Sequence, residues 1–130
     1  MQPFFFLSVD MVIQIHQRVI EEYGGDSGLR DRGLLESAVA MPQSTFGGKF
    51  LHIDLAEKAA AYHFHLCANH PFIDGKKRVA VAAAEIFILA NGCELGASDD
   101  ELGEITLGLA TGLVSKDDVI EFYKRHVVEG

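Results

Sequence analysis

The chain has 130 residues, of which 48% are hydrophobic, and a formal net charge of −8. This length and composition fit one folded domain over residues 1–130, and the negative charge disfavours general binding to DNA or RNA. No apolar stretch is long enough to cross a bilayer, so we expect no membrane role. Cys67 and Cys93 lie in apolar surroundings, a pattern that favours small core residues in a reduced, cytoplasmic protein.

Helix signals recur along the chain, whereas strand signals are almost absent. Capping residues stand before segments with apolar residues at helical spacing, and glycine or proline follows several of these segments. We predict six helices, caps included, over residues 8–23, 31–41, 54–69, 76–91, 98–111 and 115–127. The fourth is apolar on nearly every face beyond its first turn, which is typical of a helix at the centre of a domain. The predicted fold class is all-α, a bundle of about six helices around a central buried helix.

The pattern changes between the second and third helices. Two aromatic residues flank a Gly-Gly pair there, in the order Thr45, Phe46, Gly47, Gly48, Lys49 and Phe50. This arrangement predicts a short hairpin or a mobile flap before the third helix.

The most informative segment runs from His70 to Arg78 and reads His-Pro-Phe-Ile-Asp-Gly-Lys-Lys-Arg. Pro71 disfavours helical backbone in the residue before it, so His70 is expected on a loop. The next helix then begins with Lys76, Lys77 and Arg78, although a helix amino end already carries partial positive charge. Three cations are unfavourable there unless an anion binds, and phosphate is the anion that helix amino ends hold well. The segment therefore predicts a phosphate site.

The residues next to these cations have the properties needed to bind a phosphate and to transfer a proton. Gly75 permits a tight turn and the close approach of a phosphate, and Arg78 offers a planar fork for its oxygens. Asp74 supplies the oxygen ligand that Mg²⁺ prefers, and His70 has the chemistry to accept a proton from an attacking hydroxyl. Phe72 is expected to dock the loop onto the core.

Other interpretations of these residue types compete with the phosphate site. A zinc site is one alternative, with ligands drawn from His63, His65, Cys67 and His70. Residues two apart on a helix point to different faces, so core or surface positions are favoured for them over zinc ligation. His16, on the first helix, is expected to be a structural histidine. Without its neighbours, the basic triplet would be read as a solvated face.

The segment resembles the signature of Fic-fold proteins, H-x-F-x-[D/E]-G-N-x-R, and is most similar to that of the death-on-curing (Doc) toxins. The likeness extends over almost the whole chain, through Tyr23-Gly24-Gly25, Gly28-Leu29-Arg30-Asp31, Leu34-Leu35-Glu36-Ser37-Ala38, Asn69 and Asn91-Gly92. It implies a single Fido (Fic/Doc) domain, a helical bundle with a short flap. It also implies ATP- and Mg²⁺-dependent modification of a protein hydroxyl.

The resemblance implies a role for each motif residue. His70 would be the catalytic base, Asp74 the Mg²⁺ ligand, and the phosphate site would comprise Gly75, Lys76, Lys77 and Arg78. The flap from Thr45 to Lys49 would align the target. Most Fic enzymes transfer AMP, whereas Doc phosphorylates a threonine of translation factor Tu and halts protein synthesis. Lys77 matches the Doc form of the motif, so a protein kinase is favoured, with an AMP transferase as the alternative.

One position departs from the family pattern, because Lys76 stands where the signature has asparagine. A cation there grips phosphate differently from an amide, which leaves a catalytically impaired nucleotide- or protein-binding module as a third hypothesis. The inhibitory pattern of many Fic proteins, [S/T]-x-x-x-E-[G/N], is not matched, since Arg125 lies four residues before Glu129-Gly130. We therefore expect restraint by a separate antitoxin protein acting in trans.

Overall fold

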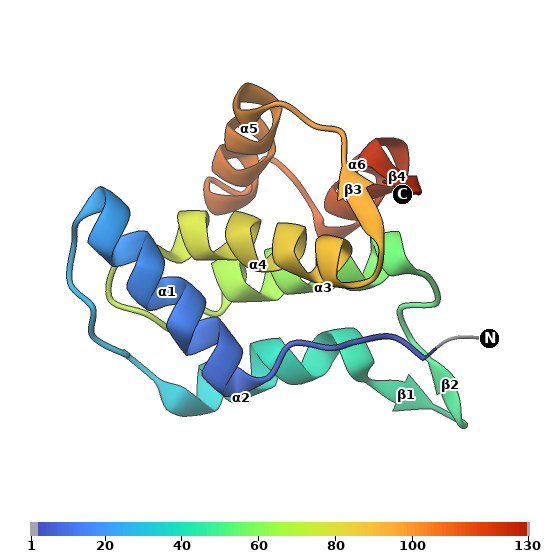
Figure 1. Cartoon of the computed structure of the whole chain (residues 1–130), viewed down its shortest axis with the longest axis horizontal. Coiled ribbons are helices and arrows are strands. Elements are labelled where there is room, and N and C mark those ends of the chain that lie inside the picture. The colour runs from blue at the N-terminus through green and yellow to red at the C-terminus, as the bar shows by residue number, and fades with distance from the viewer. Residues whose placement is uncertain (1–2, 130) are drawn as a thin grey trace.

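The computed structural model describes residues 3–129, which form six α-helices, one short 3-10 helix and four short strands (Figure 1). The α-helices are α1 (Val9–Tyr23), α2 (Arg32–Ala40), α3 (Leu55–Ala68), α4 (Lys76–Ala90), α5 (Asp99–Ala110) and α6 (Lys116–His126). The 3-10 helix η1 (Met41–Gln43) follows α2 directly. All six predicted helices are confirmed. Within residues 3–129 no helix combines the length and the apolar character needed to cross a membrane.

Side-chain caps fix where five of the six helices begin. In each case the cap side chain accepts a hydrogen bond from the backbone N–H three residues later, which satisfies a donor that the helix leaves unpaired. These caps are Ser8, Asp31, Asp54, Ser98 and Ser115. Because such bonds span three residues, the starts of these helices could be predicted from the sequence.

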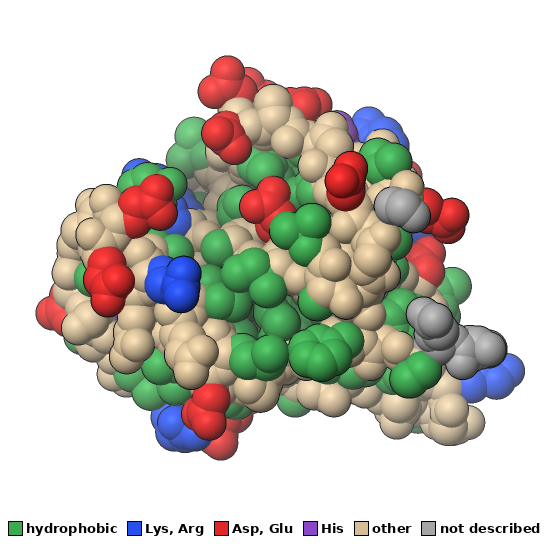
Figure 2. Space-filling model, in the orientation of Figure 1, with side chains coloured by type: hydrophobic (Ala, Val, Ile, Leu, Met, Phe, Trp, Pro, Cys, Tyr) green, Lys and Arg blue, Asp and Glu red, His purple; other side chains and the backbone are tan. Residues whose placement is uncertain are grey.

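The centre of the molecule is a pair of helices, α3 and α4, that pack along each other. Alanines on both, including Ala59 and Ala83, are fully buried and allow close approach. Figure 1 shows α2 on one side of this pair and α5 and α6 on the other. The predicted central helix, α4, thus shares the core with α3. Its outer face is exposed at Ile86 and Leu89. Figure 2 shows apolar side chains on the face of the molecule over α4.

The four strands form two small antiparallel pairs. The predicted hairpin is confirmed as β1 (Thr45–Phe46) and β2 (Lys49–Phe50), which lie before α3. The second pair, β3 (Cys93–Leu95) with β4 (Val127–Glu129), was not predicted. The last helix ends at His126 and Val127 is already extended, because residues 127–129 find a partner strand that is distant in sequence. Cys67 is buried as expected, whereas Cys93 is only half-buried, and both are free thiols.

Candidate active site

The loop between α3 and α4 presents His70 at the surface. Helix α3 ends at Ala68 with Asn69 as its cap, and His70 follows with φ +49°. It is the one non-glycine residue with positive φ among residues 3–129. Helices usually place glycine at this position, and an L side chain there costs about 1–2 kcal/mol. The exposed histidine therefore occupies a strained backbone conformation that the surroundings have to maintain.

The loop between α1 and α2 pairs with this segment through the backbone. The N–H groups of Arg30 and Asp31 donate to the Pro71 carbonyl at 2.8 and 3.1 Å, and Ile73 donates to Gly28 at 3.1 Å. A Cβ on Gly28 would lie 2.6 Å from the Cδ1 methyl of the exposed Ile73 side chain, which would have to shift to make room. Two loops about 40 residues apart thus form one unit around the motif.

The side chain of Arg30 adds a contact that the sequence pattern did not indicate. Its Nε donates to the His70 carbonyl at 2.6 Å, and its terminal nitrogen donates to the Asn69 carbonyl at 3.1 Å. An arginine directly before the cap Asp31 was visible in the sequence, but nothing local linked it to a histidine 40 residues later.

Phe72 and His16 fasten the middle of the loop to α1. Phe72 is 3% exposed, and its ring stacks on His16 with centroids 3.8 Å apart and planes at 5°. Nε2 of His16 lies 2.7 Å from the Asp74 carbonyl. Since a carbonyl only accepts, His16 carries a proton on Nε2 and donates it. Both expectations are confirmed: Phe72 docks the loop and His16 is structural.

The carboxylate of Asp74 is exposed, and one of its two oxygens is engaged in a hydrogen bond. One of its oxygens, Oδ2, accepts a hydrogen bond from the Asp26 backbone N–H at 2.8 Å. This bond fixes the side chain and leaves the other oxygen for a ligand. A hard, solvent-exposed carboxylate oxygen fits Mg²⁺, which commonly uses one or two carboxylates together with water and nucleotide phosphates.

The amino end of α4 differs from the other five helix starts. Its cap is Gly75, with φ +82° and no side-chain hydrogen bond, whereas the five other described α-helices have a side-chain cap. The positive φ favours glycine at this position, and a Cβ added there would lie 3.3 Å from the Cδ1 methyl of Ile20, which would have to give way slightly. The N–H groups of the first turn remain available to an anion.

Lys76 and His70 lie in direct contact. The Lys76 ammonium is 2.8 Å from Nδ1 and 3.0 Å from Nε2 of the ring. A neutral imidazole has one nitrogen without a proton, so the ammonium donates to that nitrogen alone. Burial lowers the pKa of His70, and the nearby charges of Lys76 and Arg30 lower it further. The neutral imidazole that results is the form that accepts a proton.

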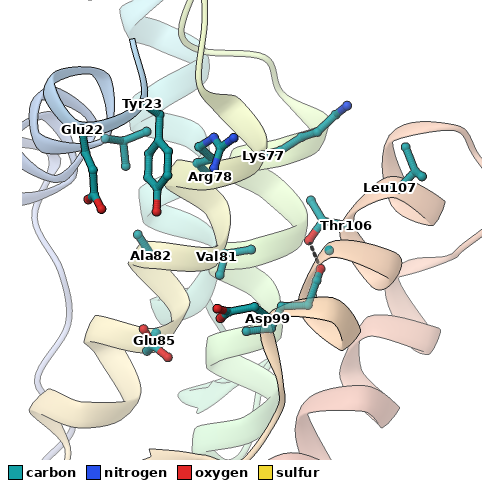
Figure 3. Close-up of a pocket in the computed structure, with 13 residues that line it drawn as sticks. Glu22, Tyr23, Lys77, Arg78, Val81, Ala82, Glu85, Asp99, Thr106 and Leu107 are labelled. Carbon is teal, nitrogen blue, oxygen red and sulfur yellow. Dashed lines mark hydrogen bonds between the residues drawn. The ribbon is translucent and has the colours of Figure 1, made fainter. Parts of the chain in front are cut away.

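Lys77 and Arg78 line a separate cavity of about 540 Å³ between α1, α4 and α5 (Figure 3). The Arg78 guanidinium lies 3.8 Å above the Tyr23 ring, and Glu85 of α4 and Asp99 of α5 also line the cavity. Neither His70 nor Lys76 lines this cavity. The structure thus divides the basic triplet: Lys76 lies with His70, whereas Lys77 and Arg78 border the cavity.

The hairpin is exposed but does not adjoin His70. Phe46 is 81% exposed at its tip, next to Gly47 and Gly48, which both have positive φ. Figure 1 shows the hairpin at the amino end of α3, opposite the end where the His70 loop begins. A helix of this length spans about 20 Å. The five predicted flap residues Thr45, Phe46, Gly47, Gly48 and Lys49 form one element, and the structure does not bring them together with the motif.

The residues considered for zinc are used in other ways. His63 is fully buried, with Nδ1 2.6 Å from the Tyr123 hydroxyl and Nε2 2.9 Å from the Thr106 hydroxyl. His65 accepts from Lys116 at 3.0 Å. Within residues 3–129 no group of three or more His, Cys, Asp or Glu side chains is arranged to hold a metal. A magnesium ion held by one carboxylate and a nucleotide needs no such group.

Comparison with known proteins identifies the family of this chain. Residues 6–88 match the model of the Fic/DOC family, and the chain therefore belongs to that family. It is 46% identical over 78 residues to the toxin Doc of Mycolicibacterium smegmatis, a match that covers 60% of this chain and 60% of that protein. It is also 32% identical over 119 residues to the protein kinase doc of Escherichia phage P1, covering 92% and 93% of the two chains. The resemblance and the helical fold predicted from the sequence are confirmed.

Proposed function

We propose that this chain is a Doc-like toxin that uses Mg²⁺ and ATP to phosphorylate a hydroxyl of a target protein. Family membership and relatives named as a toxin and as a protein kinase support the class of activity. The observation that carries the reaction is the contact of His70 with Lys76, beside a helix start whose first-turn N–H groups have no side-chain cap. A proton acceptor and an anion site are thus adjacent.

Three motif side chains, those of Asp74, Lys76 and His70, have a role in this proposal. Bound ATP would supply the phosphoryl group, and Asp74 would hold its Mg²⁺ ion through the oxygen that Asp26 does not engage. The first turn of α4, with Lys76, would hold the phosphates. His70 would take the proton of the attacking hydroxyl on a ring nitrogen, once the Lys76 ammonium has turned from the ring to the phosphate.

The proposal also covers the regulation and the target, for which the family relationship gives support. The toxin name of the relative supports an antitoxin partner that restrains this chain in trans. Translation factor Tu is the proposed target, which would make inhibition of protein synthesis the outcome. If the hairpin aligns that target, the target segment has to reach about 20 Å along α3 to His70, because the hairpin lies at the opposite end of that helix.

Paired labelling tests the reaction. Purified protein is incubated with translation factor Tu and ATP labelled at either the γ- or the α-phosphate. We expect transfer from the γ-label alone, and its loss in His70→Ala, with the melting temperature of the variant measured beside it. Transfer from the α-label would instead establish AMP transfer. No transfer from either label, in the presence of Mg²⁺ and the target, would favour the binding module that Lys76 suggests.

A further inference from the structure

His70 is strained, and few contacts hold it in place. Its φ of +49° follows the cap of α3, where glycine is usual, and the residue is exposed, so packing does not impose this conformation. The pairing of the two loops fixes Pro71 and Ile73, and the stack on His16 fixes Phe72. These contacts fix the residues after His70. The backbone of His70 itself has to be held by another group.

Arg30 bonds that backbone directly. Its fork bridges two consecutive carbonyls, those of Asn69 and His70, which lie where α3 ends and its last carbonyls have no partners within the helix. A guanidinium is suited to this because its N–H groups point in fixed, diverging directions from one plane. None of the ion pairs found within residues 3–129 involves Arg30. Its N–H groups thus bond to the backbone carbonyls of the loop and not to a carboxylate.

We propose that Arg30 is a positioning residue that holds His70 in its left-handed conformation, with the ring directed at Lys76 and the start of α4. The inference deepens the proposed function, on which it rests for the role of His70 as the base. When Arg30 is replaced, the carbonyls of Asn69 and His70 lose their donors and the strained residue relaxes. The ring then leaves the position from which it takes the proton of the hydroxyl.

The chain offers a matched control in Arg32. It lies two residues from Arg30, is also exposed, and its guanidinium is 3.9 Å from Glu36 on the next turn of α2. Replacing Arg32 removes the same charge from the same region without touching the His70 loop. Arg30→Lys is the conservative variant, since lysine keeps the charge but presents one point donor in place of the fork.

The test compares the wild type, Arg30→Met, Arg30→Lys and Arg32→Met as isotope-labelled full chains. In Arg30→Met we expect the ring and Cα resonances of His70 to shift and kcat to fall about 100-fold, the order of loss that follows a misplaced catalytic group. The KM for ATP should stay within about twofold, because the phosphate contacts are unchanged. In Arg30→Lys we expect kcat to fall about tenfold, and in Arg32→Met we expect kcat and the His70 resonances to match the wild type.

Two outcomes would overturn the inference. One is a wild-type kcat and unshifted His70 resonances in Arg30→Met. The other is an equal shift of the resonances of His63, which is fully buried and remote from the loop in sequence, because that would mean a general loss of structure. Failure of the proposed function has a different signature: the wild type transfers no label, yet the His70 resonances still move in the Arg30 variants alone, which supports the positioning of His70 by Arg30.

Discussion

The Lys76 ammonium lies 2.8 Å from Nδ1 of His70, so the residue that departs from the family signature touches the proposed base. At that distance the cation favours the neutral ring and lowers its pKa, in addition to the effect of burial. The ammonium also occupies the lone pair that has to receive a proton. Lys76 therefore favours the unprotonated form of His70 and at the same time contacts the nitrogen that would receive the proton.

Lys76→Asn should separate these two effects. Removing the cation raises the pKa of His70, so the acidic limb of the pH profile of kcat/KM should move to higher pH. The base is deprotonated above its pKa, which means that the variant loses activity at a pH where the wild type is still active. The profile is measured with γ-labelled ATP. Superimposable profiles for the two proteins would show that Lys76 does not act on His70.

Lys58 should stabilise the base of the hairpin. It is fully buried, its ammonium donates to the His52 carbonyl at 2.5 Å, and it lies 4.1 Å from the ring centroids of Phe4 and Phe50. Lys58→Ala leaves a cavity and an unpaired carbonyl, which should lower the free energy of unfolding by about 2–4 kcal/mol. Urea unfolding measures this, and amide exchange should accelerate at Phe50.

Lys124→Ala is the control for Lys58. Its ammonium lies 3.6 Å from Glu57, and its side chain is 42% exposed. The Glu57 side chain is only 14% exposed, but the lysine remains open to solvent, so we expect Lys124→Ala to cost about 1 kcal/mol, less than Lys58→Ala. If the two lysine variants lose the same free energy of unfolding, the contacts of Lys58 with the rings of Phe4 and Phe50 add no stability.

His63 should make the fold sensitive to acid. Thr106 donates its hydroxyl proton to the Leu102 carbonyl, so His63 donates from Nε2 to Thr106 and accepts at Nδ1 from Tyr123. Burial lowers the pKa of His63 to about 4, from 6.5 in the unfolded chain. Stability from this residue is complete above pH 6.5 and is lost as the pH falls toward 4, by about 2 kcal/mol between pH 7 and 5.

The measurement is the free energy of unfolding in urea at pH 7 and pH 5. His63→Phe should be less stable at pH 7, because the Tyr123 hydroxyl loses its acceptor, but its stability should change less with pH. His65, whose pKa burial also lowers to about 4, is present in both proteins and does not affect the difference. A variant with the pH dependence of the wild type would contradict the assignment.

Gly75→Ala should impair both stability and activity. Its φ of +82° is strained for alanine by about 1–2 kcal/mol, and the new Cβ would lie 3.3 Å from the Cδ1 methyl of Ile20, beside the start of α4. Gly92→Ala is matched, since Gly92 has φ +81° and a Cβ added there would meet no atom within 4 Å. Both variants should lose similar conformational stability, whereas label transfer should fall in Gly75→Ala alone. Equal activities would show that the α4 start tolerates displacement.

Local signals in the sequence determined most of the helical fold. A cap reaches three residues, and Pro71 acts on the residue before it, so helix starts and the exposure of His70 follow from neighbours in the chain. The His70-to-Arg78 motif is equally local, and its residue types alone indicated the proposed chemistry.

Tertiary structure decided which distant residues support that motif. Arg30 meets His70 across 40 residues and His16 meets Asp74 across 58, and such contacts depend on how α1 and α2 pack on α3. The separation of Lys76 from Lys77 and Arg78, and the distance of the hairpin from His70, likewise depend on the direction of α3 and α4 in space. A sequence pattern specifies the order of the residues, whereas packing of the core specifies which of them lie together on the surface.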